Sequence, residues 1–441
     1  MIIMKFGGTS VGTAESIDRV TDIVQRRLDQ DPVLVVSAHA GVTDLLIEAA
    51  ENAVEGSASV EALRERHFEL IEPFDDPELE STFEELLNEL EDLLRGISMV
   101  KELTARTRDH VLSFGERLSV RTVASRLEHA GIDAQPVDAY DLGMVTDDEF
   151  GSAQPLPEAK KQIRNNLSTI DRLPVVTGFI GKNRDGDITT LGRNGSDYSA
   201  SYIGAAAGAD EIQIWSDVEG VMTADPRIVE TAEPIHRMSF PEASELAYYG
   251  GRIHPSSLVP AVERDIPIRM LNTFEPDWDG TLILESEPDE RKVTSIVHKE
   301  GIYLIDIASP NMLARHGFME KIFRVFAEHE IVIDMVSTSE VSVSCTTDSE
   351  RNLQDAKEDL SEFCDVEILP DKAIICIVGE GMKNTSDVHQ TAFTALNREG
   401  IDPQMITQGK QKINLSLIVD EEIAEETVCT LHDALFDGTS S

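Results

Sequence analysis

Basic residues are scarce in this sequence. Its 441 residues include 38 Lys and Arg against 82 Asp and Glu, which gives a formal net charge of −44. Nucleic-acid phosphates and anionic membrane surfaces both attract Lys and Arg, so the charge balance excludes sequence-independent binding to either. Apolar residues recur at regular spacing along nearly the whole chain. The acids are therefore interpreted as a solvated surface of a folded protein rather than as disorder.

An acid-rich surface of this kind is expected at high internal salt. In molar salt the Debye length is only about 3 Å, so repulsion between surface carboxylates is screened. The composition thus suggests a halophilic protein, a hypothesis that stability at low ionic strength tests.

Cysteine pairs, long apolar runs and a leader peptide are also lacking. Cys345, Cys364, Cys376 and Cys429 form no C-x-x-C pair, so neither a zinc site nor a disulfide framework is predicted. No apolar stretch approaches the roughly 18 residues that span a bilayer, and the chain begins directly with an apolar strand. We expect a cytoplasmic protein with no membrane partner and no metal site built from its own side chains.

Alternating strands and helices predict an α/β domain over residues 1–285. Helical spacing dominates residues 44–112 and 197–208, and a βαβ unit occupies the first 40 residues. The expected buried strands are Ile2–Phe6, Val33–Val36, Val175–Ile180 and Glu211–Trp215. Strands of this type lie in a parallel sheet with helices on both faces.

A polar, proline-containing linker at residues 284–291 separates this domain from an internal repeat. Two similar segments of about 70 residues follow, and each is predicted to contain both strands and helices. The expected strands of the repeat are Ile302–Ile307, Ile331–Val336, Val341–Thr346, Ala373–Val378, Ile401–Ile406 and Ile413–Val419. Two small copies at a C-terminus suggest a sensor rather than a catalyst.

The first motif that indicates a binding or catalytic site is Lys5-Phe-Gly-Gly-Thr-Ser10. A strand ends in two glycines and feeds a helix N-terminus, where backbone N–H groups and the helix dipole favour an anion. Lys5 adds a charge for a transferring phosphate. The spacing differs from G-x-x-x-x-G-K-[ST], so a P-loop NTPase is not predicted. A plain structural turn is the alternative.

Three further motifs lie between strands and helices. Leu191–Tyr198 carries Arg193, which suits a carboxylate, although Ser196 or Asp197 in that loop also fits a helix N-cap. Ser113–Arg117 carries Glu116, and an isolated Glu is most often a surface acid. The stretch from Trp215 begins at a strand C-terminus, where open α/β sheets bind ligands.

Together these motifs resemble the aspartate kinases of the amino acid kinase superfamily. The matching stretches are Lys5–Ser10, Val36–Thr43, Phe114–Glu116, Thr190–Arg193, Trp215–Arg227 and Glu245–Gly250. The resemblance covers essentially the whole chain, and the C-terminal repeat resembles paired ACT domains. It implies a carbamate kinase-like three-layer α/β/α domain (1–285) followed by two ferredoxin-like α+β ACT domains (293–441). One ACT domain would span about 308–370, and the other 293–307 plus 371–441.

The resemblance implies a monofunctional enzyme that transfers phosphate from ATP, with Mg²⁺, to L-aspartate, the first step toward lysine, threonine and methionine. It assigns the catalytic roles to Lys5 and Asp197. The implied ATP-binding residues are Lys5, Gly7, Gly8, Thr9, Ser216, Asp217, Met222, Arg227 and Arg252. The implied substrate residues are Ser37, Thr43, Glu116, Arg193, Asn194, Gly195 and Ser196. Glu116 would accept the substrate ammonium, and Arg193 would hold its α-carboxylate.

Some positions depart from the family pattern. Asn194 stands where Gly is common, Met222 where Tyr is usual, and Arg252 where Lys is typical.

The C-terminal repeat resembles the lysine-sensitive members of the family. The implied residues for the effector L-lysine are Met312, Arg315, Phe318, Met319, Asp334, Ser339, Glu340 and Val341. Paired ACT domains imply a homodimer or a dimer of dimers. Two alternatives stay open: a kinase for glutamate or N-acetylglutamate, and an inactive ACT-bearing sensor that binds amino acids without chemistry.

Overall fold

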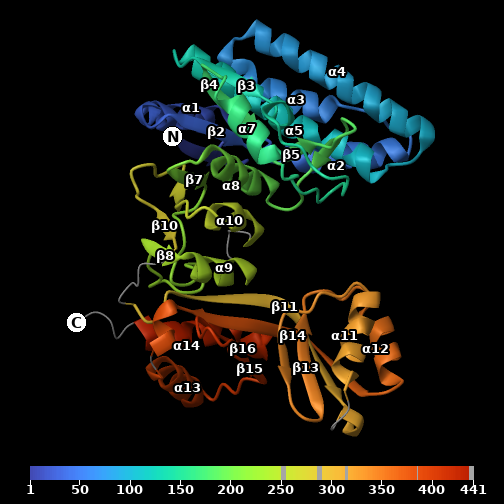
Figure 1. The fold of residues 1–441 in the computed structure, drawn as a ribbon, viewed down its shortest axis with the longest axis vertical. Coiled ribbons are helices and arrows are strands. Elements are labelled where there is room, and N and C mark those ends of the chain that lie inside the picture. Colours follow the sequence, from blue (N-terminus) through green and yellow to red (C-terminus); the bar gives the residue numbers. More distant parts are fainter. Residues whose placement is uncertain (250–254, 286–290, 313–315, 385, 437–441) are drawn as a thin grey trace. The chain divides into compact units, whose positions relative to one another are not determined.

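The structure is a computed structural model that describes residues 1–249, 255–285, 291–312, 316–384 and 386–436 (Figure 1). These residues form two compact units. The first unit contains Met1–Val221 and residues 255–285; the second contains residues 222–249 and the described residues from 291 onward. Two predicted site residues, Arg252 and Arg315, lie outside the described residues. By its contacts, segment 222–249 belongs to the second unit, whereas the sequence placed it in the domain 1–285. The domain boundaries expected from sequence remain predictions.

The first unit is built on a mostly parallel sheet with the strand order β3-β4-β2-β1-β7-β9-β10. Its strands are β1 (Ile2–Phe6), β2 (Pro32–Val36), β3 (Ala134–Val137), β4 (Leu173–Thr177), β7 (Glu211–Ser216), β9 (Ile268–Asn272) and β10 (Thr281–Leu284). Neighbouring strands run parallel, except that β10 is antiparallel to β9. A separate antiparallel hairpin joins β5 (Ile180–Lys182) and β6 (Ile188–Thr190).

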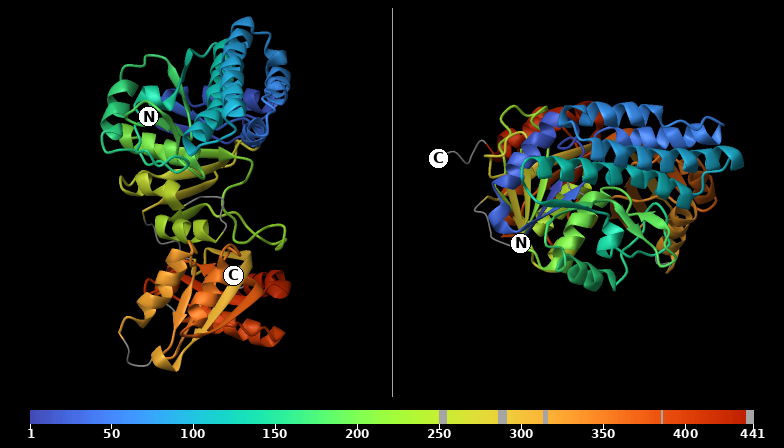
Figure 2. Two further views of the ribbon diagram at one scale, coloured as in Figure 1. Left: turned by 90° about the vertical axis from the view of Figure 1, so that its right-hand side faces the viewer. Right: turned by 90° about the horizontal axis from the view of Figure 1, so that it is seen from above.

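Helices cover both faces of this sheet, as the views in Figures 1 and 2 show. One face packs against α1 (Ala14–Gln25), α2 (Val42–Val54) and α5 (Ala105–His129), with α3 (Glu61–Ile71) and α4 (Pro77–Val100) stacked outside. On the other face, α8 (Gly195–Ala207) lies with α7 (Ala159–Leu167) and α10 (Pro255–Val262). This confirms the predicted α/β/α layers.

Alternation along β1 decides where its functional lysine points. All five residues of β1 are buried, as expected for a central parallel strand covered on both faces. Ile2, Met4 and Phe6 join the core beneath α1, α2 and α5. Successive side chains of a strand point to opposite faces, so Ile3 and Lys5 point toward α8.

The second unit is an antiparallel sheet with the order β12-β13-β11-β14-β16-β15. The strands are β11 (Ser295–Ala308), β12 (Val336–Thr338), β13 (Ser342–Thr347), β14 (Asp365–Val378), β15 (Met405–Thr407) and β16 (Asn414–Asp420). Its helices are α9 (Phe240–Tyr248), α11 (Phe318–Glu328), α12 (Leu353–Ser361), α13 (Asp387–Glu399) and α14 (Ala424–Phe436), and β8 (Arg237–Ser239) precedes α9.

Two long strands are shared between the halves of this sheet. The start of β11, Ser295–Lys299, pairs with the end of β14, and its remainder, Ile302–Ala308, pairs with the start of β14 and with β13. The register shifts around Gly301, which adopts a φ of +70°. We call residues 302–371 the first half and residues 295–299 with 372–436 the second half. Each half has its own apolar core.

Ile302–Ile307 and Ala373–Val378 lie within the longer strands β11 and β14, and three other expected strands are interrupted or begin later, for local reasons. Val175–Ile180 is interrupted because Phe179 has a φ of +64°, which no strand residue adopts. The strand expected at Ile331–Val336 begins only at Val336, because the Met335 N–H donates to the Thr346 hydroxyl instead of a ladder carbonyl. β15 begins at Met405, after Pro403, which has no N–H to donate. Among the described helices, each is too short or too polar to cross a membrane.

Candidate active site

The glycine turn after β1 lies against the loop that follows β2. The Gly7 N–H donates to the Trp215 carbonyl over 3.0 Å, and the Gly8 carbonyl accepts from the Ala40 N–H over 3.1 Å. A β-carbon on Gly8 would lie 2.8 Å from the Ala38 carbonyl oxygen, closer than packing allows. Gly8 is therefore required for the two loops to meet at the carboxyl end of the sheet.

Free backbone amides line this turn. The N–H groups of Gly8, Thr9 and Ser10 donate to no other atom of the residues that the structure describes. The Ser10 hydroxyl is fixed by Thr273 Oγ1 at 2.8 Å, which holds the turn against the end of β9. Successive free amides of this kind form a concavity that binds an anion. The turn thus has the donors that a phosphate requires.

Lys5 pairs with Asp197 beside the turn. Lys5 Nζ lies 2.5 Å from Asp197 Oδ1, and the two side chains are only 10% and 13% exposed. Asp197 lies in the first turn of α8, where the helix dipole favours negative charge. The pair therefore positions the lysine ammonium next to free amides in a site with little water.

Glu116 reaches the same place from α5. Its Oε1 accepts from the Ala38 N–H over 3.2 Å, and the side chain is buried. A β-carbon on Gly115 would lie 2.8 Å from the Ala38 β-carbon, so only glycine allows α5 to approach this loop. Burial raises the pKa of Glu116 to about 8, although the Ala38 amide and the nearby Lys5 oppose the shift. A cationic group that binds in this buried site would therefore find a carboxylate to pair with.

The loop between β6 and α8 carries Arg193 and has a constrained backbone. Asn194, at the helix N-cap, has a φ of +52°, which explains why glycine suits this position; asparagine tolerates it better than most residues. A β-carbon on Gly195 would lie 2.7 Å from the Phe179 ring. Ser196 packs against Gly178, and Arg193 is exposed without an ion-pair partner among the described residues. Its guanidinium is therefore available to a carboxylate.

Asp109 anchors the end of β6, where this loop begins, and was missed by the sequence analysis. It is buried on α5, and its oxygens accept from the N–H groups of Gly151 and Thr190 and from the Thr190 hydroxyl. Burial raises the pKa of Asp109, opposed by these three bonds. Asp109 and Glu116 are two helical turns apart, so they share a face of α5; that spacing in the sequence was the available signal.

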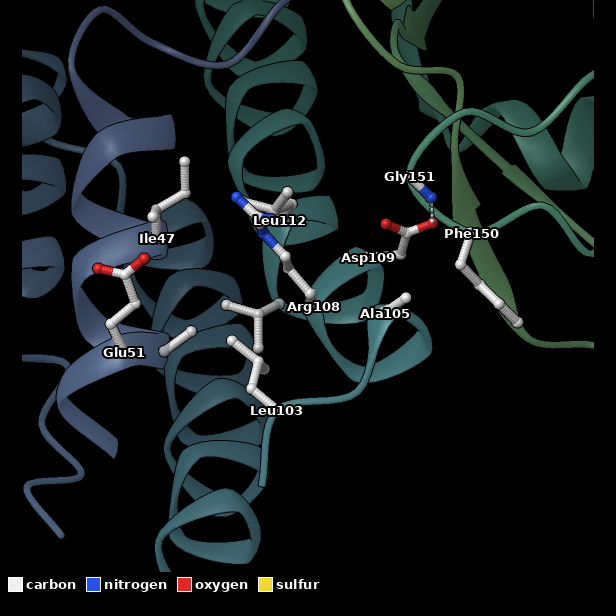
Figure 3. Close-up of a pocket in the computed structure, with 11 residues that line it drawn as sticks. Ile47, Glu51, Leu103, Ala105, Arg108, Asp109, Leu112, Phe150 and Gly151 are labelled. Atoms are coloured by element: carbon white, nitrogen blue, oxygen red, sulfur yellow. Dashed lines mark hydrogen bonds between the residues drawn. The ribbon is translucent and has the colours of Figure 1, made fainter. Parts of the chain in front are cut away.

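A cavity of about 320 Å³ lies between α2, the first half of α5 and residues 150–151 (Figure 3). Figure 3 shows Glu51 on α2, Arg108 on α5 and Phe150 around it, with Asp109 bonded to the Gly151 amide. Among the predicted site residues, none lines this cavity.

Two predicted substrate residues lie on the loop and helix after β2. The Ser37 N–H donates to the Phe6 carbonyl over 3.1 Å, which ties this loop to the end of β1. Thr43 is exposed in the first turn of α2. The two residues flank the segment that contacts Gly8 and Glu116.

The predicted nucleotide residues are split between the units. Lys5, the glycine turn, Ser216 and Asp217 belong to the first unit, the last two at the end of β7. Met222 and Arg227 belong to the second unit, and the Arg227 guanidinium pairs there with Asp225. Their role in nucleotide binding stays a prediction.

The predicted effector residues of the second unit also divide. Met312, Phe318 and Met319 pack into or against the core of the first half. Ser339 accepts from two amides in the turn between β12 and β13, where Glu340 and Val341 are exposed. Asp334 precedes β12, on the order of 15 Å from that turn along extended chain. Among the described residues, the predicted effector residues thus lie on three different parts of the first half: its core, the β12–β13 turn and the residue before Met335.

Comparison with known proteins gives consistent matches over the whole chain. The amino acid kinase family model matches residues 1–272, and an ACT domain model matches residues 305–362 and 375–435. Aspartokinase 1, chloroplastic, of Arabidopsis thaliana is 39% identical, covering 99% of this chain and 80% of that protein. Lysine-sensitive aspartokinase 3 of Escherichia coli is 33% identical, covering 99% of both.

Solved structures agree. E. coli aspartokinase III in complex with aspartate and ADP (R-state) has a TM-score of 0.85 and 31% identity, covering 99% of this chain and 100% of that one. The same enzyme with lysine and aspartate (T-state) has a TM-score of 0.82 and 31% identity, covering 99% of each chain.

Proposed function

The chain belongs to the amino acid kinase family, among its aspartokinases, and we propose that it transfers the γ-phosphoryl group of ATP to the side-chain carboxylate of L-aspartate. One observation carries the proposal: Lys5, Asp197, the free amides of the glycine turn and Glu116 meet at one end of the sheet. The similarity to an enzyme crystallised with aspartate and ADP supports it.

The charges at this site suit two anionic reactants. The turn amides and Lys5 bind the transferring phosphate and stabilise the charge that develops on it. Glu116 accepts the aspartate ammonium, and Arg193 forms a bidentate pair with its α-carboxylate. The acceptor carboxylate is already ionised near neutral pH, so no general base is needed. The work of the protein is therefore to bring two anions into line.

Mg²⁺ is proposed to enter with the nucleotide. It would neutralise the phosphate oxygens when bound, and the Asp197 carboxylate, beside the turn, is a ligand type that suits it. Ser216, Asp217, Met222, Arg227 and Arg252 are proposed for the nucleotide, and Ser37, Thr43 and the loop Asn194–Ser196 for aspartate.

The second unit is proposed to bind L-lysine and to lower the activity. The similarity to a lysine-sensitive enzyme supports this, as does an acid with an unsatisfied oxygen: Asp334 Oδ2 is buried and has no hydrogen-bond partner among the described residues. A lysine ammonium would supply the missing donor.

A homodimer or a dimer of dimers is proposed to complete the lysine site. β12 lies at the sheet edge, and Val336 and Val341 expose 40% and 46% of their surface there. An exposed apolar edge strand favours pairing with another chain. A second copy could bring its Ser339–Val341 turn near Asp334. The enzyme is proposed to act in the cytoplasm, at the first step toward lysine, threonine and methionine.

A coupled ADP-release assay tests the activity. Purified protein is given ATP with L-aspartate, L-glutamate or N-acetylglutamate, and turnover is expected with L-aspartate alone. Lys5→Ala should reduce turnover by at least about a hundredfold with the fold retained, whereas Lys161→Ala, at an exposed lysine, should not. Turnover with another acceptor would identify a different amino acid kinase, and none with any acceptor would favour an inactive sensor.

A further inference from the structure

Helix α9 is fastened to the second half of the antiparallel sheet by several side chains. Glu242 Oε1 accepts from the Thr294 hydroxyl over 2.6 Å and from the Glu380 N–H over 2.8 Å. Glu245 accepts from Asn414 over 2.7 Å. These contacts fix the helix to the second half and to the residues just before it.

Tyr248, the last residue of α9, reaches the first half instead. Its hydroxyl donates to Asp334 Oδ1 over 2.5 Å, whereas Glu242, Glu245 and Tyr249 form side-chain bonds to the second half and to Thr294. The ring packs edge-on against Tyr249 at 5.1 Å, and the Tyr249 hydroxyl contacts Ser416 in the second half. Two adjacent tyrosines therefore contact different halves of the sheet.

Asp334 is held in place by its backbone, but only one of its two carboxylate oxygens has a hydrogen-bond partner among the described residues. Its N–H donates to the Thr346 carbonyl over 2.8 Å, which ties the residue to β13. Tyr248 satisfies Oδ1, whereas Oδ2 is buried without a partner among the described residues. Lys299 lies near the Tyr248 ring, but its ammonium pairs with Asp348 at 2.8 Å. Burial raises the pKa of Asp334, with Tyr248 and Lys299 opposing the shift.

A buried carboxylate oxygen without a donor is costly, so a cation that reaches it gains more than one at the surface. Binding at Oδ2 would also change the charge that the Tyr248 hydroxyl meets at Oδ1. In the sequence, Tyr248 precedes Pro255, the first residue of α10 in the kinase unit, by seven positions. A change at Asp334 thus has a short covalent route to that unit.

We propose that Tyr248 is a positioning residue of the effector site, orienting Asp334 for an ammonium ligand and coupling occupancy of the first half to α9. The inference rests on the proposed lysine site and adds the residue through which that site acts. Coupling requires that the ligand favour one of two states; the bonded and broken forms of the Tyr248–Asp334 contact are those states.

Tyr248→Phe removes only the hydroxyl, and Tyr249→Phe is the matched control, because it removes a hydroxyl that contacts the second half. L-lysine binding is measured by calorimetry on the full-length protein. Inhibition by saturating L-lysine is measured as a fraction of each variant's own uninhibited rate. Circular dichroism melts verify folding.

Tyr248→Phe should still bind L-lysine, with affinity weakened less than about tenfold, and lose more than half of the maximal inhibition. Tyr249→Phe should retain the inhibition. Equal inhibition in wild type, Tyr248→Phe and Tyr249→Phe would overturn the role of Tyr248 and leave the lysine site intact. Absence of L-lysine binding to the wild type would refute the lysine site and this inference with it.

Discussion

The ammonium of Lys5 lies 2.5 Å from the carboxylate of Asp197, although one residue belongs to the first strand and the other to the first turn of α8. The contact fixes the cation beside the free amides of the glycine turn. It exists because β1 alternates its side chains between two helical layers.

Replacing Asp197 by Asn should remove the partner that positions Lys5. Loss of position at a phosphoryl-transfer site costs on the order of a hundredfold in rate, so kcat should fall by about that factor in steady-state assays. Asp210→Asn is the matched control, since Asp210 pairs with the N-terminal amine at an exposed site. Normal kcat in Asp197→Asn would show that the ion pair is only structural.

Glu116 should make aspartate binding pH-dependent. In the ligand-free protein burial raises the pKa of its carboxyl to about 8, so the charged form that suits an ammonium grows as pH rises toward that value. The KM for aspartate should fall between about pH 6 and 8. In Glu116→Gln it should be at least about tenfold higher and change less over this range. Glu85→Gln, at an exposed glutamate, is the control.

The same carboxyl should affect stability with the opposite sign. A pKa raised from 4.5 to about 8 means that the folded state holds an extra proton between those values. The contribution of Glu116 to the free energy of unfolding is therefore present at low pH and is lost as pH rises through that window. Glu116→Gln should lack this loss. The melting temperature of the variant should therefore rise relative to that of the wild type as pH increases from about 5 to 8. A constant difference would contradict the assignment.

Asp109→Asn should loosen the loop that carries Arg193. Both N–H groups donate to Oδ2, so an amide oxygen in its place keeps them only as neutral hydrogen bonds, and the amide nitrogen cannot accept from the Thr190 hydroxyl as Oδ1 does. Replacing a charged acceptor by a neutral one costs about 1 kcal/mol or more. The KM for aspartate should rise by about tenfold, more than the KM for ATP, and the melting temperature should fall. Asp185→Asn, in an exposed turn, should change neither. Equal increases in both KM values would argue against a specific effect on aspartate.

Salt should stabilise the protein. The net charge of −44 sets carboxylates against each other at low ionic strength, and molar KCl reduces the Debye length to about 3 Å. The melting temperature should rise by at least about 10 °C between 0.1 M and 2 M KCl. Sucrose at matched osmolality is the control, because it is excluded from the protein surface but does not screen charge. Full stability in dilute buffer would remove the case for salt adaptation.

The sequence by itself determined the layers, the order of the motifs and the family. Local patterns carry that information: apolar strands, helical spacing and glycine turns depend on neighbours along the chain. Lys5, Glu116 and Arg193 could be named in advance because each lies in a recognisable motif.

Tertiary structure alone decided which motifs meet. Asp109 looks like an ordinary acid among the arginines of α5 until Gly151 and Thr190, the last residue of β6, come against it and supply three donors. Asp334 and Tyr248 are 86 positions apart, and only the folded second unit joins them. Burial and long-range hydrogen bonds arise from packing between distant segments, so a pattern of near neighbours does not encode them in readable form.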